Sequence, residues 1–374
     1  TLSTVGGNLK LNGTGGIQTN SNLGVRVAFS SALSTTDGAI TITGTAGTGT
    51  SSNVGVFIGS DATIDVASGS LSVTGVGVGT TTNNDGVRVE TGGQISSTTG
   101  NITLIGTGGD GTNNNYGVLV DDSTTSILTT DGTISITGTG GAGTGTSNHG
   151  TILNGNATIQ TTNNGNIDIT GTGTGIGGAT DINHGLVVSN TLIQTLNGDI
   201  SLTGVGGAGT TSSNYGVQLY NASHAISTGS GNITLTGTGG TGRSNYGIYM
   251  QGQGASTDLA AGTVTKLQTN TGNISLIGNG TNDGADPSGN NFGIFLQNAA
   301  RITGLGATAD ITLDGTAGTG TGSDYGIYMD GIGVNANTEA VTILEANGGN
   351  ISLTGRGAIT GSRNYGINLT DSAQ

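Results

Sequence analysis

Short segments that alternate apolar and polar residues recur along the whole chain. The first has the form apolar-x-apolar-x-Gly and begins at Leu9, Ile40, Leu71, Ile102, Ile134, Ile167, Ile200, Ile233, Ile274, Ile311 and Ile351. Because its two apolar residues are two positions apart, its side chains alternate between two faces, as in a β-strand. Consecutive copies are 31 to 41 residues apart. A period in this range indicates a solenoid, a propeller or an array.

Two further segments occupy the rest of each repeat. The second has the form Asn-x-Gly-apolar, and its Gly is present in all eleven copies, from Gly24 to Gly366. The third is of the Ile-Gln-Thr type, with its apolar residue at Ile64, Ile95, Ile127, Ile159, Ile193, Ile226, Leu267, Ile302 and Ile343. Each repeat therefore carries three short strands. A propeller blade needs four strands and commonly contains Trp, which this chain lacks.

The pattern thus predicts an all-β fold, a right-handed parallel β-helix (β-solenoid) of about eleven coils, each with three short strands and 31 to 41 residues. Like residues of successive coils would stack at about 4.8 Å. We expect one domain, 1–374, with regular coils in 1–250 and lateral loop insertions in 251–374, at 251–264, 279–290 and 331–340. These insertions are either a partner surface or tolerated drift. The chain is interpreted as a segment of a longer solenoid or as a subunit that stacks end to end.

The Asn of the second segment forms a column that we predict to be a structural ladder. A side-chain amide can donate to one neighbouring coil and accept from the other, which adds about 0.5–1.5 kcal/mol per hydrogen bond. We expect Asp324 to be the weak rung. The alternative is that each Asn only occupies a left-handed surface turn. The column comprises Asn22, Asn53, Asn84, Asn115, Asn148, Asn183, Asn214, Asn245, Asn291, Asp324 and Asn364.

The residue that follows this Asn varies between apolar, acidic and aromatic types. Because a buried position would not accept Asp85, His149 and Tyr116 interchangeably, we expect this column to be at least half exposed, with its later rings stacked. An aromatic stack can hold a sugar ring, but it more commonly stabilises the wall of the solenoid. The candidate surface stack is Tyr116, Tyr215, Tyr246, Phe292, Tyr325 and Tyr365.

Two Gly columns, Gly13 to Gly355 and Gly24 to Gly366, predict corners where a Cβ would clash or φ is positive.

Composition restricts the partners. The chain has 8 Lys and Arg against 22 Asp and Glu and a formal charge of −14, with no basic stripe, so we expect no nucleic-acid partner. It has no Cys, which excludes disulfides and thiolate metal sites. No apolar run is long enough to span a membrane, so we expect no membrane insertion in this segment. A polar, Gly-rich chain is typical of disorder, but eleven apolar columns in register argue against it.

Candidate chemistry is sparse, and we predict neither an enzyme nor a bound cofactor or metal. Catalysis on this scaffold needs clustered carboxylates, whereas the outward acids Asp65, Asp168, Asp199, Asp310 and Asp314 are scattered over distant coils. Gly108–Gly111 only faintly resembles a calcium-binding repeat, and no nonapeptide period accompanies it.

Ice binding is a minor alternative function. Outward Thr and Ser residues, such as Thr41 and Thr43, recur along the first segments and form a hydroxyl ladder. The ladder is interrupted by Lys10, Asp168, Ile277 and Asp314. Thr is also common on sheet surfaces for reasons of strand propensity alone.

With these repeats laid out, the chain resembles the filamentous-haemagglutinin-like large exoproteins and autotransporter passengers of Gram-negative bacteria. The resemblance rests on motifs such as Gly-Asn-Ile-Ser-Leu-Thr-Gly at 349–355 and Asn-Tyr-Gly-Ile at 364–367. It implies a secreted or cell-surface adhesin or structural fibre that is exported by a type V route. We therefore expect a rigid stalk or fibre segment, with a self-assembling filament subunit as the alternative. Its partners would be further copies or a continued chain, a cell-surface protein or a glycan.

Overall fold

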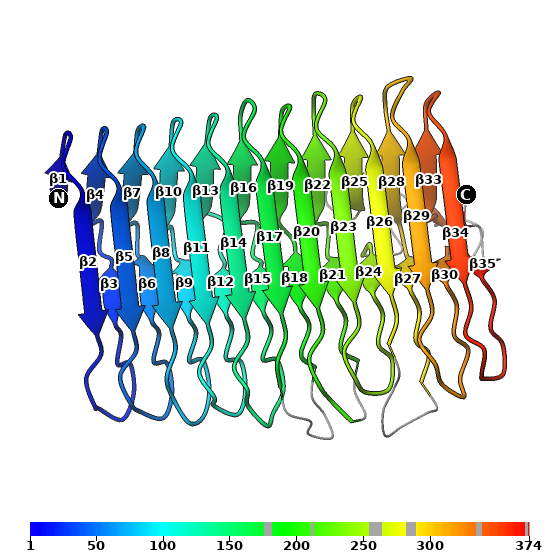
Figure 1. Ribbon diagram of the computed structural model, residues 1–374, viewed down its shortest axis with the longest axis horizontal. Coiled ribbons are helices and arrows are strands. Elements are labelled where there is room, and N and C mark those ends of the chain that lie inside the picture. Colours follow the sequence, from blue (N-terminus) through cyan, green and yellow to red (C-terminus); the bar gives the residue numbers. More distant parts are fainter. Residues whose placement is uncertain are drawn as a thin grey trace.

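The computed structural model describes residues 1–175, 182–210, 213–253, 264–281, 289–333, 339–370 and 373. Within these residues the chain forms strands and no helix, and the strands build three parallel sheets of eleven strands each. Each coil contributes one strand to each sheet, as the sequence pattern predicts. The protein is a parallel β-solenoid (Figure 1).

The first sheet contains β1 (Leu2–Thr4), β4 (Ala32–Thr35), β7 (Thr63–Val66), β10 (Gln94–Ser97), β13 (Ser126–Thr129), β16 (Thr158–Thr161), β19 (Leu192–Thr195), β22 (His224–Ser227), β25 (Thr265–Thr269), β28 (Ala300–Gly304) and β33 (Ile343–Ala346).

The second sheet contains β2 (Leu9–Thr14), β5 (Ile40–Thr45), β8 (Leu71–Val76), β11 (Ile102–Thr107), β14 (Ile134–Thr139), β17 (Ile167–Thr172), β20 (Ile200–Val205), β23 (Ile233–Thr238), β26 (Ile274–Asn279), β29 (Ile311–Thr316) and β34 (Ile351–Arg356).

The third sheet contains β3 (Val25–Val27), β6 (Val56–Gly59), β9 (Val87–Glu90), β12 (Val118–Val120), β15 (Thr151–Leu153), β18 (Leu186–Ser189), β21 (Val217–Tyr220), β24 (Ile248–Gln251), β27 (Ile294–Gln297), β30 (Ile327–Asp330) and β35 (Ile367–Thr370). A small antiparallel pair, β31 (Ile332–Gly333) and β32 (Glu339–Ala340), lies within the predicted insertion 331–340. Most of the insertions 251–264 and 279–290, with Pro287, lie outside the described residues.

The winding is right-handed, as expected. In Figure 1 the strands of the second sheet run downward in front, the chain returns upward behind them, and each coil advances from the N-terminus toward the C-terminus. The loops between the second and third sheets run along one edge of the rod (Figure 1). Thr/Gly/Ser-rich loops carry too few apolar residues to pack inside, which accounts for this position.

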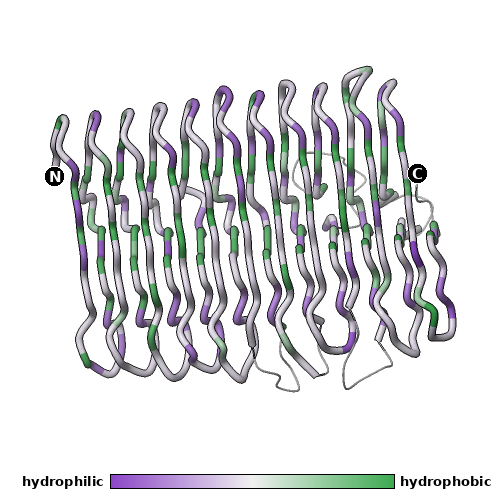
Figure 2. The backbone as a smooth tube through the Cα atoms, viewed as in Figure 1, coloured by the Kyte–Doolittle hydropathy of each residue, from purple (hydrophilic) through white to green (hydrophobic). Residues whose placement is uncertain are grey.

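The core is one continuous apolar column that runs along the axis. The second-sheet strands alternate buried and outward residues, so that Ile40 and Ile42 are fully buried while Thr41 and Thr43 face outward. The same alternation of hydrophobic and hydrophilic residues is visible along these strands in Figure 2. Each fully buried apolar side chain contributes about 1.5–3 kcal/mol, which makes this column the main stabilising term.

The third segment is shifted by one residue in two of its copies, where our prediction is wrong. Ala225 pairs with Ile193 and Leu267 and is fully buried, so Ile226 faces outward. In the last coil Leu344, rather than Ile343, pairs with Ile302 and packs against the core. Register is set by pairing with the flanking strands, and this pairing outweighs the greater apolar character of an isoleucine one position away.

Close backbone approach accounts for the two Gly columns. A Cβ on Gly106 would lie 1.9 Å from the carbonyl oxygen of Gly117, and one on Gly117 would lie 2.2 Å from the backbone nitrogen of Thr139. None of the described Gly residues in these two columns has a positive φ, so the alternative of a left-handed backbone is wrong. The corners between the second and third sheets can close only because Gly lets the backbone atoms of neighbouring segments come into direct contact.

Candidate functional site

The Asn column forms a buried hydrogen-bonded ladder. In the first coils each Asn donates both its backbone N–H and its Nδ2–H to Oδ1 of the next Asn, at 3.0 and 2.8 Å from Asn22 to Asn53 and at 3.1 and 2.9 Å from Asn84 to Asn115. From Asn53 to Asp324 the column is fully buried. The left-handed residues precede the ladder, as Ser52 precedes Asn53. The surface-turn alternative is therefore wrong.

The Asp324 rung retains one of these two links. Its Oδ1 accepts the backbone N–H of Asn291 at 2.8 Å, and its own N–H donates to Asn364 at 3.2 Å. Nδ2 of Asn291, however, is buried and has no hydrogen-bond partner within the described part of the chain. Because a carboxylate lacks the Nδ2–H donor of asparagine, Asp324 cannot make the bond that Asn245 donates from Nδ2 to the carbonyl oxygen of Gly242 at 2.9 Å, which agrees with a weak rung at this coil.

A second ladder, which the sequence analysis missed, stands at the corner before the second sheet. Here the later coil donates to the earlier one: the N–H of Asp199 reaches Oδ1 of Asn166 at 2.9 Å, and the N–H of Asn232 reaches Oδ1 of Asp199 at 2.8 Å. Asp310 continues it by accepting the N–H of Asn350 at 2.7 Å. Its sequence signal is the Asn or Asp directly before the first apolar residue of the repeat.

The outward acids therefore have structural partners. Asp199 and Asp310 belong to the corner ladder, Asp65 accepts a hydrogen bond from Ser96 at 2.7 Å, and Asp314 pairs with Arg356. Burial, together with the charge of Asp199, raises the pKa of Asp168. Among the described residues, no group of three or more His, Asp or Glu side chains could hold a metal ion.

The outward hydroxyl residues of the second sheet lie in straight columns. Thr137, Thr170, Thr203 and Thr236 are paired rung by rung on four successive strands. Ile277 and Asp314 then follow in the same column. The interruptions seen in the sequence therefore fall on the face itself, and the hydroxyl array is regular over only part of the rod.

The residues after the ladder Asn form one continuous stack of rings. It runs through Tyr116, His149, His184, Tyr215, Tyr246, Phe292, Tyr325 and Tyr365, with centroids 4.6 to 5.8 Å apart and planes within 11° of parallel. The predicted stacking is present, and two histidines that we did not include belong to it.

Our expectation that this column is at least half exposed is wrong. Tyr246, Phe292 and His184 are 9%, 3% and 5% exposed, and only the last ring, Tyr365, is about half exposed. The outward residues of the third sheet cover the rings: in the later coils Tyr249 and Phe295 pack against them at centroid distances near 5 Å. Because each ring between Tyr116 and Tyr365 uses both faces on its neighbours, the interior of the stack offers no free face to a sugar ring.

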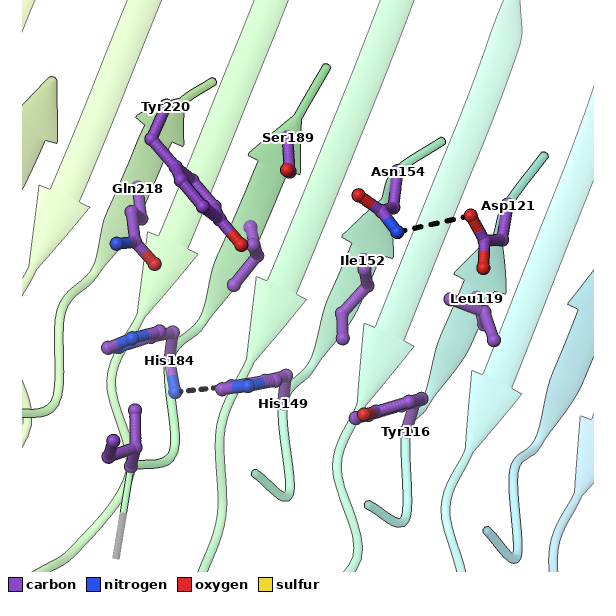
Figure 3. Close-up of a pocket in the computed structure, with 12 residues that line it drawn as sticks. Tyr116, Leu119, Asp121, His149, Ile152, Asn154, His184, Ser189, Gln218 and Tyr220 are labelled. Carbon is purple, nitrogen blue, oxygen red and sulfur yellow. Dashed lines mark hydrogen bonds between the residues drawn. The ribbon is translucent and has the colours of Figure 1, made fainter. Parts of the chain in front are cut away.

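Where the outward residues of the third sheet are smaller than Tyr249 and Phe295, a groove opens beside the stack. It has a volume of about 380 Å³ and lies on the outer face of β12, β15, β18 and β21 (Figure 3). Its lining includes the ring edges of Tyr116, His149 and His184, the apolar side chains Leu119, Ile152 and Val187, and a polar row of Asp121, Asn154, Ser189, Gln218 and Tyr220. No sequence pattern marks this polar row, because its members share no single residue type.

Bulky neighbours occupy the position equivalent to Ile152 on either side of the groove. In the coil before it, Arg88 binds the buried Asp85, with Nε 2.8 Å from Oδ2, and lies 3.7 Å from Glu90. Burial raises the pKa of Asp85, which Arg88 opposes. In the coil after it, Tyr249 contacts Tyr215 and Tyr246. The groove is thus restricted to the middle coils.

The two histidines are held in one orientation by the backbone of the following coil. The N–H of His184 donates to Nδ1 of His149, and the N–H of Tyr215 donates to Nδ1 of His184, each at 2.9 Å (Figure 3 shows the first bond). Each neutral ring therefore carries its proton on Nε2. Burial lowers the pKa of His149 to about 4, and burial together with His149 lowers that of His184 well below its ordinary value.

These pKa shifts predict a loss of stability in mild acid. The unfolded chain, with its histidine pKa near 6.5, binds more protons than the folded chain below that pH, so stability falls from about pH 6.5 toward pH 4. For His149 the loss is about 3 kcal/mol at the lower limit. Tyr116 and Tyr215 flank the pair in the stack, and Asp121 and Tyr220 line the same groove.

Urea unfolding measured between pH 7 and pH 4 checks this prediction against the double variant His149→Asn/His184→Asn. Asn supplies a side-chain oxygen for the next N–H, as the carboxylate of Asp85 does for Tyr116 at 2.9 Å. Unlike histidine, Asn does not titrate. We expect a clearly shallower pH dependence in the variant. Equal slopes would contradict the assignment of the loss to these rings, because every other titratable group is present in both proteins.

The comparisons identify no relative. No protein-family model matches the chain, and neither the curated proteins nor the solved structures provide a significant match. Within the described residues, the search for a helix of sufficient length and apolarity to cross a membrane found none.

Proposed function

We propose that this chain is a non-enzymatic, rigid structural and adhesive β-solenoid, a stalk or fibre segment of an extracellular adhesin. The observation that carries the proposal is the coil-to-coil continuity of the molecule: three sheets, a buried Asn ladder and a ring stack all run parallel to one axis. Bending the rod would stretch these interactions on one side. Such a body is suited to holding a binding surface at a fixed distance.

Two further observations support this assignment. The outward carboxylates are engaged in ladder bonds and ion pairs on separate coils, and paired catalytic carboxylates have to face a common substrate. The resemblance of the repeats to filamentous-haemagglutinin-like exoproteins supports a secreted or bacterial cell-surface location, with a surface protein or glycan as the partner. The groove beside the ring stack is the candidate adhesive element.

Electron microscopy of the purified chain over a range of concentrations tests the proposal. Eleven coils at about 4.8 Å predict straight rods about 50 Å long whose length does not depend on concentration. Variable or bent particles would contradict a rigid spacer.

The alternative function, a filament subunit that stacks head to tail, predicts a different outcome of the same measurement. It is supported by the parallel pairing of successive coils in all three sheets, because the same pairing could continue from one copy to the next. Unpaired strand edges can accept the strands of another copy. Long fibres with an axial repeat near 50 Å would favour this alternative over the isolated spacer, provided that the fibres become longer as the protein concentration rises.

A further inference from the structure

The groove beside the ring stack has two chemically different parts. Its apolar side chains, Leu119, Ile152 and Val187, are the central residues of three successive third-sheet strands and pair with one another in register. Polar groups of both hydrogen-bonding types lie on either side of them (Figure 3). The lining therefore repeats an apolar contact and polar contacts once per coil, at intervals of about 4.8 Å along the axis.

Two of the polar groups are donors that the fold has oriented but not used. His149 and His184 are only 8% and 5% exposed, and their Nδ1 atoms accept backbone N–H groups. Their Nε2–H groups have no hydrogen-bond partner among the described residues, although both rings line the groove. Because both rings line the groove, water or a ligand there can accept from these donors.

We propose that this groove binds a neutral, extended glycan that runs parallel to the solenoid axis, an inference that rests on the adhesive part of the proposed function. A pyranose ring combines an apolar face with a rim of hydroxyls, which corresponds to an apolar contact and polar contacts repeated in each coil. The hydroxyls accept from Nε2 of His149 and His184 and donate to the carboxylate of Asp121. Sugar rings lie against the aliphatic side chains, because the aromatic faces are occupied by one another.

The charge of the groove selects against acidic ligands. Asp121 lies in the polar row, where one oxygen, Oδ1, accepts a hydrogen bond from Asn154 at 3.1 Å. The two imidazoles are neutral because burial lowers the pKa of both. Asp121 and the chain charge of −14 repel carboxylated or sulfated chains, and the neutral imidazoles provide no positive charge to offset this repulsion.

An extended peptide fits the groove less well than a glycan. Its side chains on one face recur about every 6.6 Å, against about 4.8 Å for the coils. Its backbone amides would also lack a strand edge with which to pair, since the third sheet is already paired on both sides of β15 and β18.

Calorimetric titration with β-1,4-linked cello- and chito-oligosaccharides of two to six units tests the proposal at pH 7.5. The lining spans four coils, from β12 to β21, so we expect affinity to rise up to about four units and then level off. Ile152→Trp should fill the groove and reduce the affinity at least tenfold. The matched control, Asn368→Trp, changes the equivalent outward position of β35 and should leave binding unchanged.

The double variant His149→Asn/His184→Asn separates the two donors from the shape of the groove. It preserves acceptors for the next coil and removes both Nε2–H groups, so we expect a five- to tenfold loss of affinity with an unchanged rod in electron microscopy. The proposal is overturned by absence of binding, by equal affinity of Ile152→Trp and the native chain, or by tighter binding of oligogalacturonate than of neutral chains. Straight rods without glycan binding would overturn this inference alone and leave the structural function in place.

Discussion

Replacing Gly117 with alanine is expected to prevent the central coils from closing. The new Cβ would lie 2.2 Å from the nitrogen of Thr139, 2.5 Å from the oxygen of Gly150 and 2.6 Å from the carbonyl carbon of Gly138. All three are backbone atoms of strands or corners held by pairing on both sides, so no side-chain movement can relieve the clash. We expect the free energy of unfolding to fall by more than about 4 kcal/mol, a magnitude typical of severe steric clashes or unpaired buried charges.

Urea unfolding followed by circular dichroism measures this loss. Gly6→Ala is the control, because a Cβ there meets no atom within 4 Å, and its effect should stay within about 0.5 kcal/mol. If Gly117→Ala were as stable as this control, the corners would be more open than the observed backbone contacts require. If the variant fails to accumulate in folded form, Gly106→Ala, whose Cβ meets the carbonyl of Gly117, should fail in the same way.

Replacing Asn245 with leucine is the second large expected effect. Oδ1 of Asn245 accepts the N–H of Asn214 at 3.2 Å, and its Nδ2 donates to the carbonyl of Gly242 at 2.9 Å, all in a fully buried position. Leucine has a similar size but supplies neither group. Because each buried polar group that loses its partner costs about 1–3 kcal/mol, we expect the free energy of unfolding to fall by about 2–4 kcal/mol.

The corner ladder provides the matched control for this change. Asn101 also accepts the N–H of the next coil, from Thr133 at 2.9 Å, but it is exposed. Water can replace the lost acceptor there, so Asn101→Leu should cost less than about 1 kcal/mol. Urea midpoints at constant slope measure both losses in the free energy of unfolding. If Asn101→Leu and Asn245→Leu lost the same amount, burial would not strengthen the hydrogen bonds of the inner ladder.

Much of the architecture was predictable because one coil repeats the same local requirements eleven times. The apolar positions at Ile40 and Ile42 and the Asn column recur in the same order in every coil, and only parallel stacking brings such copies into register. The inner ladder, the three strands per coil and the Gly corners follow from this. Where a copy deviates, the local pattern is insufficient: it predicts that Ile226 faces the core, although pairing places Ala225 there.

The candidate site was much less predictable. Whether the residue after the ladder Asn is exposed depends on the outward residue of the third-sheet strand, which comes from another part of the same coil. Tyr249 and Phe295 cover Tyr246, whereas Ile152 leaves the groove open beside His149. The varied residue types of this column predict exposed side chains, but the side chains are buried with different partners. Asp85 binds a guanidinium, and the imidazoles accept backbone N–H groups.

The sequence by itself therefore determined the solenoid, its number of coils, the buried apolar columns and the Asn ladder, because these depend on periodicity and on chemistry that each coil repeats. Only the tertiary structure decided the register of the irregular copies, the burial of the ring stack and the groove between His149 and Asp121. These features arise from contacts between residues of unlike type in different columns. Such contacts have no period, so the repeat pattern carries no signal for them.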